Sequence, residues 1–216
     1  MRIDADIRRD VESELKWDPS IDDRRLGVSV NNGVVTLTGD VPHYSGRWAA
    51  EDCAKRVCGV RAVANDIEIK IPASGTRSDT DIAEAAANAL SWNVSLSGTE
   101  IKPVVKDGWV SLSGQVSWGY QRIAAESAVR NLMGVKGVSN QITVKSTAKA
   151  SDVKAKIEDA FKRHAILDAK DIQVVVHNAT VTLNGHVHTW QEREDAILAA
   201  WAAPGVTMVE NHLSIQ

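Results

Sequence analysis

The chain repeats one sequence pattern three times, and this repetition constrains its fold more than any other feature. The pattern Val-x-Leu-x-Gly-x-Val spans residues 35–41 and recurs 75 residues later and then after another 71 residues. The same two offsets relate an arginine, a glycine–valine pair and an asparagine in every copy. These residues are Arg47, Arg122 and Arg193; Gly59-Val60, Gly134-Val135 and Gly205-Val206; and Asn65, Asn140 and Asn211. Matches in one register indicate a tandem repeat of a single domain.

Each copy is long enough to fold as a domain without disulfides or a metal ion. We expect domains at residues 1–71, 77–145 and 149–216. The segments from Pro72 to Thr76 and from Ser146 to Lys149 join them, and both are short and rich in small or polar residues, as is typical of linkers. The chain is therefore interpreted as three tandem domains with limited freedom between neighbours.

The first half of each copy predicts a helix and a hairpin. Apolar residues recur at every fourth position near the start of the copy, which is typical of a helix with one buried face. These residues are Ile7, Val11 and Leu15, then Ile82, Ala86 and Leu90, then Val153, Ile157 and Phe161. Alternating apolar residues between Leu26 and Val30 indicate a half-buried strand. A turn follows at residues 31–33, 106–108 and 177–179, and it leads into a second strand with one polar face.

The second half of each copy predicts a helix and a closing strand. In the first copy the helix spans roughly residues 45–57, and Gly59 marks its end as a left-handed cap. The closing strand runs from Val63 to Ile69, with a right-handed crossover from the strand before the helix. The predicted fold is therefore α+β, with three tandem α-β-β-α-β domains, each a three-stranded mixed sheet with two helices on one face.

Charge and hydropathy limit the partners that the chain can have. A net charge of −3 provides no general basic field, so we expect no nucleic-acid partner. No stretch approaches the roughly 18 apolar residues of a membrane-spanning helix. The segment Met1 to Arg8 lacks the features of a secretory signal, which predicts a cytoplasmic protein. A signal removed from an earlier position would instead place the protein in the periplasm.

The repeated unit resembles the BON domain, which is named after bacterial OsmY and nodulation proteins. The resemblance depends on the lead helix, the Val-x-Leu-x-Gly-x-Val strand, the following helix and a closing Gly-Val-x-x-Val-x-Asn segment, and it covers nearly the whole chain. It implies a phospholipid- or ligand-binding module of bacterial envelope and stress proteins, associated with transport and without catalytic residues. The third copy departs most, because Ala179 replaces the turn glycine and Ala202-Ala203-Pro204 ends the second helix.

The sequence lacks the motifs of the common enzyme classes. It contains no nucleophile elbow, phosphate-binding glycine loop, dinucleotide fingerprint or paired metal-ligand motif, so we expect no enzyme and no cofactor. The repeated glycines of the second strand are interpreted as structural, serving close packing of the second helix or a bulge. They are Gly39, Gly114 and Gly185. Cys53 and Cys58 point apart on a helix, and we assign them no function.

Three histidines of the third copy form the strongest candidate for a metal site. His186 and His188 share one face of a strand, and His177 lies near the hairpin turn. Two or three imidazoles could bind zinc. The other copies have no equivalent residues, so a solvated strand face is the preferred interpretation and no metal is predicted.

Arginines and aromatic residues provide the binding candidates. An arginine opens the second helix of every copy and could bind a carboxylate or phosphate, although a structural partner within the domain is the favoured interpretation. Aromatic residues in the preceding loops suit a lipid or protein interface. The candidates for ligand or lipid binding are Tyr44, Arg47, Trp118, Tyr120, Arg122, Trp190 and Arg193. We interpret Trp48 and Trp109 as inter-domain packing, and Trp17 and Trp92 as core residues.

Two classes of function follow from these features. The first is a binding protein that engages phospholipid or another amphipathic ligand through the aromatic loops and the arginine-bearing helix starts, under stress conditions. The alternative is a scaffold for protein association or self-association that uses polar sheet faces and exposed strand edges. The sequence predicts no particular oligomeric state.

Overall fold

The computed structural model describes residues 2–145, 153–163 and 171–215, and each repeat is described by itself. The second predicted linker, from Ser146 to Lys149, lies outside these ranges. Within them, no helix is long and apolar enough to cross a membrane.

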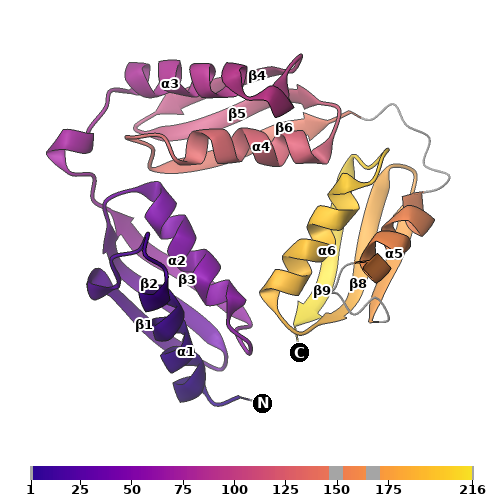
Figure 1. Cartoon of the computed structure of the whole chain (residues 1–216), viewed down its shortest axis with the longest axis horizontal. Helices are drawn as coiled ribbons and strands as arrows, with labels where there is room; N and C mark the ends of the chain where they lie inside the picture. The colour runs from indigo at the N-terminus through magenta and orange to yellow at the C-terminus, as the bar shows by residue number, and fades with distance from the viewer. Residues whose placement is uncertain (1, 146–152, 164–170, 216) are drawn as a thin grey trace. The chain divides into compact units, whose positions relative to one another are not determined.

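The three repeats have the same order of helices and strands (Figure 1). The first contains α1 (Asp4–Trp17), η1 (Asp23–Arg25), β1 (Leu26–Asn31), β2 (Val34–Val41), α2 (Tyr44–Arg56) and β3 (Ala62–Ile69). The second follows η2 (Ala73–Gly75) and contains α3 (Asp79–Trp92), η3 (Val94–Leu96), β4 (Glu100–Lys106), β5 (Trp109–Val116), α4 (Gly119–Arg130) and β6 (Gly137–Val144). The third contains α5 (Val153–Arg163), β7 (Ile172–His177), β8 (Thr180–Val187), α6 (Trp190–Ala202) and β9 (Met208–Ile215). The predicted α-β-β-α-β order is confirmed.

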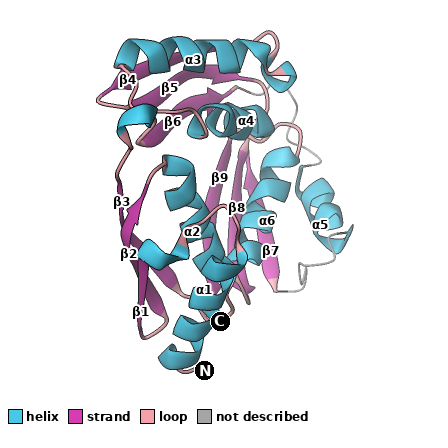
Figure 2. Ribbon diagram, turned by 60° about the vertical axis from the view of Figure 1, so that its left-hand side comes forward, coloured by secondary structure: helices cyan, strands magenta, loops and turns pink. Residues whose placement is uncertain are grey.

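Each sheet has three strands, with the strand that carries the repeated pattern at its centre (Figure 2). In the first repeat β2 pairs antiparallel with β1, and Val30 lies opposite Val35. β2 pairs parallel with β3, and Leu37 lies opposite Asn65. The second repeat has the same pairings. The α+β class and the mixed sheets are therefore as predicted.

The core of each repeat lies between its helices and one face of its sheet. The predicted helix stripes are buried in all three copies, and Val11, Ala86 and Ile157 are fully buried. The central strands contribute alternate residues to the same core, such as Val35 and Leu37. Burial of an aliphatic side chain of this size stabilises a fold by about 1.5–3 kcal/mol. The hydrophobic periodicity therefore predicted the buried faces correctly.

The repeated glycine of the central strand has a backbone that other residues rarely adopt. The φ angles are 113° at Gly39, 139° at Gly114 and 126° at Gly185. A Cβ atom at each position would collide with a backbone carbonyl oxygen at the start of the first strand, which belongs to Arg25, Glu100 and Asp171 in the three repeats. The close neighbour is thus the adjacent strand and not the second helix. Glycine lets these two backbones approach each other.

The second helix ends farther before its glycine than the sequence predicted. α2 ends at Arg56 with Val57 as its cap, and Val57 has extended backbone angles. Gly59 has a φ angle of 92° but lies two residues beyond this cap, in the turn that leads to β3. Its Cβ would contact Ile7 of α1 at 3.1 Å. The glycine therefore permits a close turn near α1 and is not itself the helix cap.

Candidate functional site

Two tryptophans that the sequence assigned to the core are instead among the most exposed large hydrophobic residues described. Trp17 is 84% exposed at the end of α1, and Trp92 is 90% exposed at the end of α3. Each follows a buried leucine by two residues, which is about 200° around a helix. The prediction was wrong because it relied on their apolar character. The phase of the buried stripe already placed both side chains on the outer face.

A second exposed apolar segment of the second repeat spans the start of α4, with Trp118 just before the helix and Tyr120 in its first turn. Trp118 is 39% exposed and Tyr120 is 50% exposed. The backbone N–H groups of Ser117 and Trp118 both donate to the side-chain oxygen Oε1 of Gln121, at 3.1 Å each. The nitrogen Nε2 of Gln121 donates to the carbonyl oxygen of Ser95 at 3.2 Å. One side chain therefore joins the loop before α4 to the turn after α3.

The turn after α3 presents a further apolar side chain. Val94 is 88% exposed, and Leu96 two residues later is buried and anchors the turn. The side chain of Asn93 accepts a hydrogen bond from the N–H of Ser95 at 3.0 Å. We call Trp92, Val94, Trp118 and Tyr120 together the aromatic end of the second repeat.

The two sequence segments that carry the aromatic end contain no charged residue. Residues 91–99 and 108–121 contain no Asp, Glu, Lys or Arg. α3 has no basic residue in its last turn, whereas α1 has Lys16 there. The aromatic end is therefore suited to an apolar or zwitterionic surface rather than to an anion.

The other predicted aromatic residues are half-buried, pack locally or are no more exposed than Trp118. The sequence placed Tyr44 and Trp190 in loops, but they are the first residues of α2 and α6, and both are half-buried. Trp48 is 39% exposed. Trp109 lies over Gly137 on the neighbouring strand of its own sheet, where a Cβ would collide with the ring. Of the predicted loop set, Trp118 and Tyr120 are thus the members that the structure exposes most.

In the first repeat, the repeated arginine contacts the closing strand of its own repeat. Arg47 donates from a guanidinium nitrogen to the carbonyl oxygen of Asn65 at 2.8 Å. The Asn65 amide donates in return to the Arg47 carbonyl at 3.2 Å and to the Glu51 carboxylate at 3.1 Å. In the second repeat Asn140 contacts the carbonyl of Arg122 in the same way. Arg193 is half-buried.

The three histidines do not form one cluster. His177 ends β7 beside the turn, whereas His186 follows the residue that pairs with the opposite end of β7. Five residues of strand at about 3.3 Å each separate these ends by roughly 16 Å. Nδ1 of His186 lies 2.7 Å from the hydroxyl of Ser214. His188 follows the end of β8, and within the described ranges no three His, Cys, Asp or Glu residues are placed to hold a metal ion.

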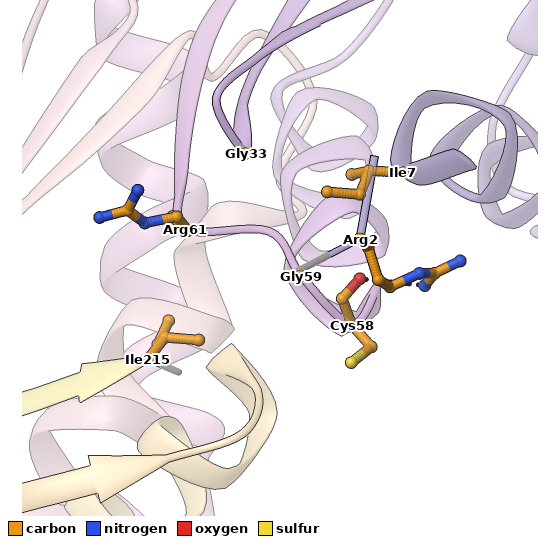
Figure 3. Close-up of a pocket in the computed structure, with 7 residues that line it drawn as sticks. All are labelled: Arg2, Ile7, Gly33, Cys58, Gly59, Arg61 and Ile215. Carbon is orange, nitrogen blue, oxygen red and sulfur yellow. Dashed lines mark hydrogen bonds between the residues drawn. The ribbon is translucent and has the colours of Figure 1, made fainter. Parts of the chain in front are cut away.

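The cysteines and the hollow near them carry no site. Cys53 is buried, which raises its pKa to about 11, and Cys58 is exposed; both thiols are free. Cys58, Arg2 and Arg61 line a hollow of the first repeat, and Figure 3 shows the two guanidinium groups pointing in opposite directions. Arg2 is already bound by Asp10 and by the Cys58 carbonyl at 3.1 Å. The two cations therefore do not converge on one ligand.

Comparisons with known proteins agree with the repeat. The chain is 33% identical over 119 residues to the 21 kDa hemolysin of Actinobacillus pleuropneumoniae, covering 54% of this chain and 61% of that protein. It therefore spans less than two thirds of that relative. It is 29% identical over 147 residues to the osmotically-inducible protein Y of Escherichia coli, covering 66% of this chain and 73% of that protein.

A solved structure is also similar over most of the chain, although weakly. It is CdsD, a structural protein of the type III secretion system of Chlamydia trachomatis, with 14% identity, a TM-score of 0.26, and coverage of 98% of this chain and 92% of that chain. The likeness is too weak to support an argument about function. The BON domain pattern, in contrast, matches residues 3–71, 78–146 and 149–216. The chain therefore belongs to the BON domain family and contains three BON domains.

Proposed function

We propose that this BON domain protein is a non-catalytic binding protein whose second repeat docks on a phospholipid surface through the aromatic end. The observation that carries the proposal is the exposure of two tryptophans, a tyrosine and a valine on segments without charge. Trp and Tyr rings combine an apolar body with a polar atom, which suits the boundary between lipid headgroups and acyl chains.

The size of the exposed side chains is sufficient for a measurable affinity. Transfer of a large apolar side chain out of water contributes about 1.5–3 kcal/mol. Trp92 and Val94 are almost fully exposed, so most of this contribution is available on docking. Part of it is offset by the loss of motional freedom on association. We therefore expect reversible binding to membranes rather than permanent anchoring.

The arrangement of charges predicts how the binding responds to salt. The sequence favoured a structural partner for the arginines at the helix starts over a phosphate, and Arg47 does bond to Asn65 in its own repeat. The aromatic end itself carries no basic residue. Apolar insertion is not screened by ions, whereas contact between lysine or arginine and anionic lipid is. Binding should therefore be similar on neutral and anionic vesicles and at low and physiological salt.

Co-sedimentation with vesicles tests this proposal. We would compare vesicles of phosphatidylcholine with vesicles that also contain phosphatidylglycerol, using the wild type and the Trp92→Ala/Trp118→Ala double variant. We expect the double variant to bind about tenfold or more weakly, which corresponds to about 1.4 kcal/mol or more. Trp109→Ala is the matched control, because it removes an exposed tryptophan from the open sheet face. Equal losses in the two variants, or no sedimentation of the wild type, would overturn the proposal.

The relatives support a role under stress. The likeness to the osmotically-inducible protein Y of Escherichia coli supports induction of this protein by osmotic stress. A rise in its transcript after an increase in external osmolarity would support this part of the proposal. An unchanged transcript level would contradict it.

Protein association is the second candidate function, because the outer strands of each sheet are open within their own repeat. β2 is central, so β1 and β3 each have one edge without a partner strand in that repeat. In β4 of the second repeat, Pro103 removes one backbone donor, which weakens strand addition at that position. Concentration-dependent oligomers in ultracentrifugation, together with no binding to vesicles, would favour this candidate.

A further inference from the structure

Gln121 differs in burial from every other polar residue in the described part of the chain. It is the one polar or charged residue there that is buried, with an exposure of 7%. A buried amide is stable only when its donors and acceptors have partners. Gln121 lies in the first turn of α4, directly after the exposed Trp118 and Tyr120. Its position therefore links a buried polar contact to an exposed apolar segment.

The hydrogen bonds of Gln121 reach both segments of the aromatic end. Its oxygen accepts from the backbone N–H groups of Ser117 and Trp118, and these two bonds hold the loop that carries Trp118. Its nitrogen donates to the carbonyl of Ser95, which directly follows the exposed Val94. Residues 95 and 121 are 26 positions apart in the sequence. The side chain thus fixes two distant apolar segments relative to each other.

The other repeats have different residues at this position. The repeat offsets place Gly46 in the first copy and Glu192 in the third. Glycine has no side chain with which to bridge the two segments. An ionised glutamate could accept hydrogen bonds from the loop but could not donate to a carbonyl. Only the second repeat therefore has a side chain at this position that can both accept and donate in the observed manner.

We propose that Gln121 is a positioning residue that holds Trp92 and Val94 in one arrangement with Trp118 and Tyr120, and that it makes the second repeat the docking repeat. This inference rests on the proposed function. An apolar surface that is already ordered before docking loses less side-chain and loop freedom on binding. The contribution of Gln121 to binding is therefore preorganisation, without contact between Gln121 and the lipid.

The test combines amide hydrogen exchange with vesicle binding in the full chain. Gln121→Ala removes all three hydrogen bonds, and Gln121→Glu keeps the two acceptor contacts while losing the donor to Ser95. Gln141→Ala is the matched control, because Gln141 is exposed on β6. We expect the amides of Ser117 and Trp118 to exchange about tenfold or more faster in Gln121→Ala and at the wild-type rate in Gln121→Glu and Gln141→Ala.

Vesicle binding is measured at a temperature at which circular dichroism shows that every variant is folded. We expect Gln121→Ala to bind phosphatidylcholine vesicles about tenfold more weakly, Gln121→Glu to have an intermediate affinity, and Gln141→Ala to bind like the wild type. If Gln121 only stabilised the fold, its replacement would lower the unfolding temperature and leave the affinity for vesicles unchanged.

The outcomes separate the two proposals. If the wild type does not bind vesicles, the proposed function fails, and the role of Gln121 in docking fails with it. If the wild type binds and Gln121→Ala binds equally well, the inference about Gln121 fails while the proposed function stands. If Gln121→Ala leaves the exchange of both amides unchanged, the inference is overturned whatever the affinity.

Discussion

The first two repeats and the third build the same fold, but their polar contacts differ. In the first repeat the carboxylate of Asp4 accepts from the N–H groups of Asn32 and Gly33 at 2.7 and 2.9 Å. In the second, Asp79 binds the turn residues Asp107 and Gly108 at the same distances. The repeat offsets place Ala150 and Ala179 at the corresponding aspartate and glycine positions of the third copy.

A second polar contact shows the same division. The closing-strand asparagine donates to a glutamate of the second helix at 3.1 Å in the first two repeats, from Asn65 to Glu51 and from Asn140 to Glu126. The third repeat has Ile197 at the glutamate position. All three asparagines keep the local bond to the N–H two residues later, as Asn211 does with Leu213 at 3.0 Å. The apolar pattern and the strand glycine are therefore common to all copies, whereas the aspartate and the glutamate that make these contacts occur at the repeat positions of the first two copies only.

The largest expected effect concerns the glycine of the central strand, which all three repeats share. Gly114→Ala should destabilise the second repeat by about 3–4 kcal/mol, because the new methyl group meets the carbonyl of Glu100 and φ is positive. Gly98→Ala is the matched control, since its φ is 77° but no atom lies within 4 Å of the new methyl group. It should cost about 1 kcal/mol. Urea unfolding measures both, and equal costs would show that the close approach of the strands is unimportant.

The next effect concerns the contact between the lead helix and the turn. Asp79→Ala removes two charge-assisted hydrogen bonds and should destabilise the second repeat by about 1.5–2 kcal/mol. Asp79→Asn keeps one acceptor and should cost about half as much. The readouts are the urea midpoint and the hydrogen exchange of the Asp107 and Gly108 amides. Unchanged exchange in Asp79→Ala would mean that the turn is held without the carboxylate.

The glutamate contact predicts a difference in acid sensitivity. Burial raises the pKa of Glu51, but hydrogen bonds from Lys55 and Asn65 outweigh this effect and leave the pKa below its ordinary value. The pKa is thus lower in the folded than in the unfolded state. The resulting stability is present above the ordinary value of 4.5 and is lost as the pH falls through the folded-state pKa.

Replacement of Glu51 tests this difference. Glu51→Gln should remove this part of the acid sensitivity of the first repeat, and the change should be less than about 1 kcal/mol because the carboxylate is partly exposed. Hydrogen exchange of first-repeat amides between about pH 6 and about pH 3 would measure it. The third repeat, with Ile197, should lack this contribution. An identical pH profile for wild type and variant would contradict the prediction.

The smallest effect tests the exposed tryptophans. Trp92→Ala should change the free energy of unfolding by about 0.5 kcal/mol or less, because the side chain is 90% exposed. Leu90→Ala, two residues earlier and buried, should cost about 2–5 kcal/mol. Chemical denaturation of both variants makes the comparison. A large loss for Trp92→Ala would restore the interpretation of Trp92 as a core residue.

Much of the fold could be predicted because the relevant patterns are local. The spacing of Ile7, Val11 and Leu15 identifies a helix and its buried face without knowledge of any other element. The candidate site was predicted only in part. Trp118 and Tyr120 were identified from their loop, but Trp92 was assigned to the core because its chemical type was given more weight than its helical phase. Gln121 carried no signal in the sequence, because nothing near it indicates a partner at Ser95.

The amino-acid sequence alone identifies the three repeats, the order of helices and strands, and most of the residues that form each core. The recurrence of one pattern identifies the repeats. The apolar periodicity that identifies the helices, the strands and the core acts between residues a few positions apart. Which segments meet is known from the tertiary structure and not from the sequence. Gln121 contacts Ser95 across 26 residues, and Asp79 contacts Gly108 across 29. Such contacts depend on where the ends of separate elements lie after the core has packed, and no local pattern records that position.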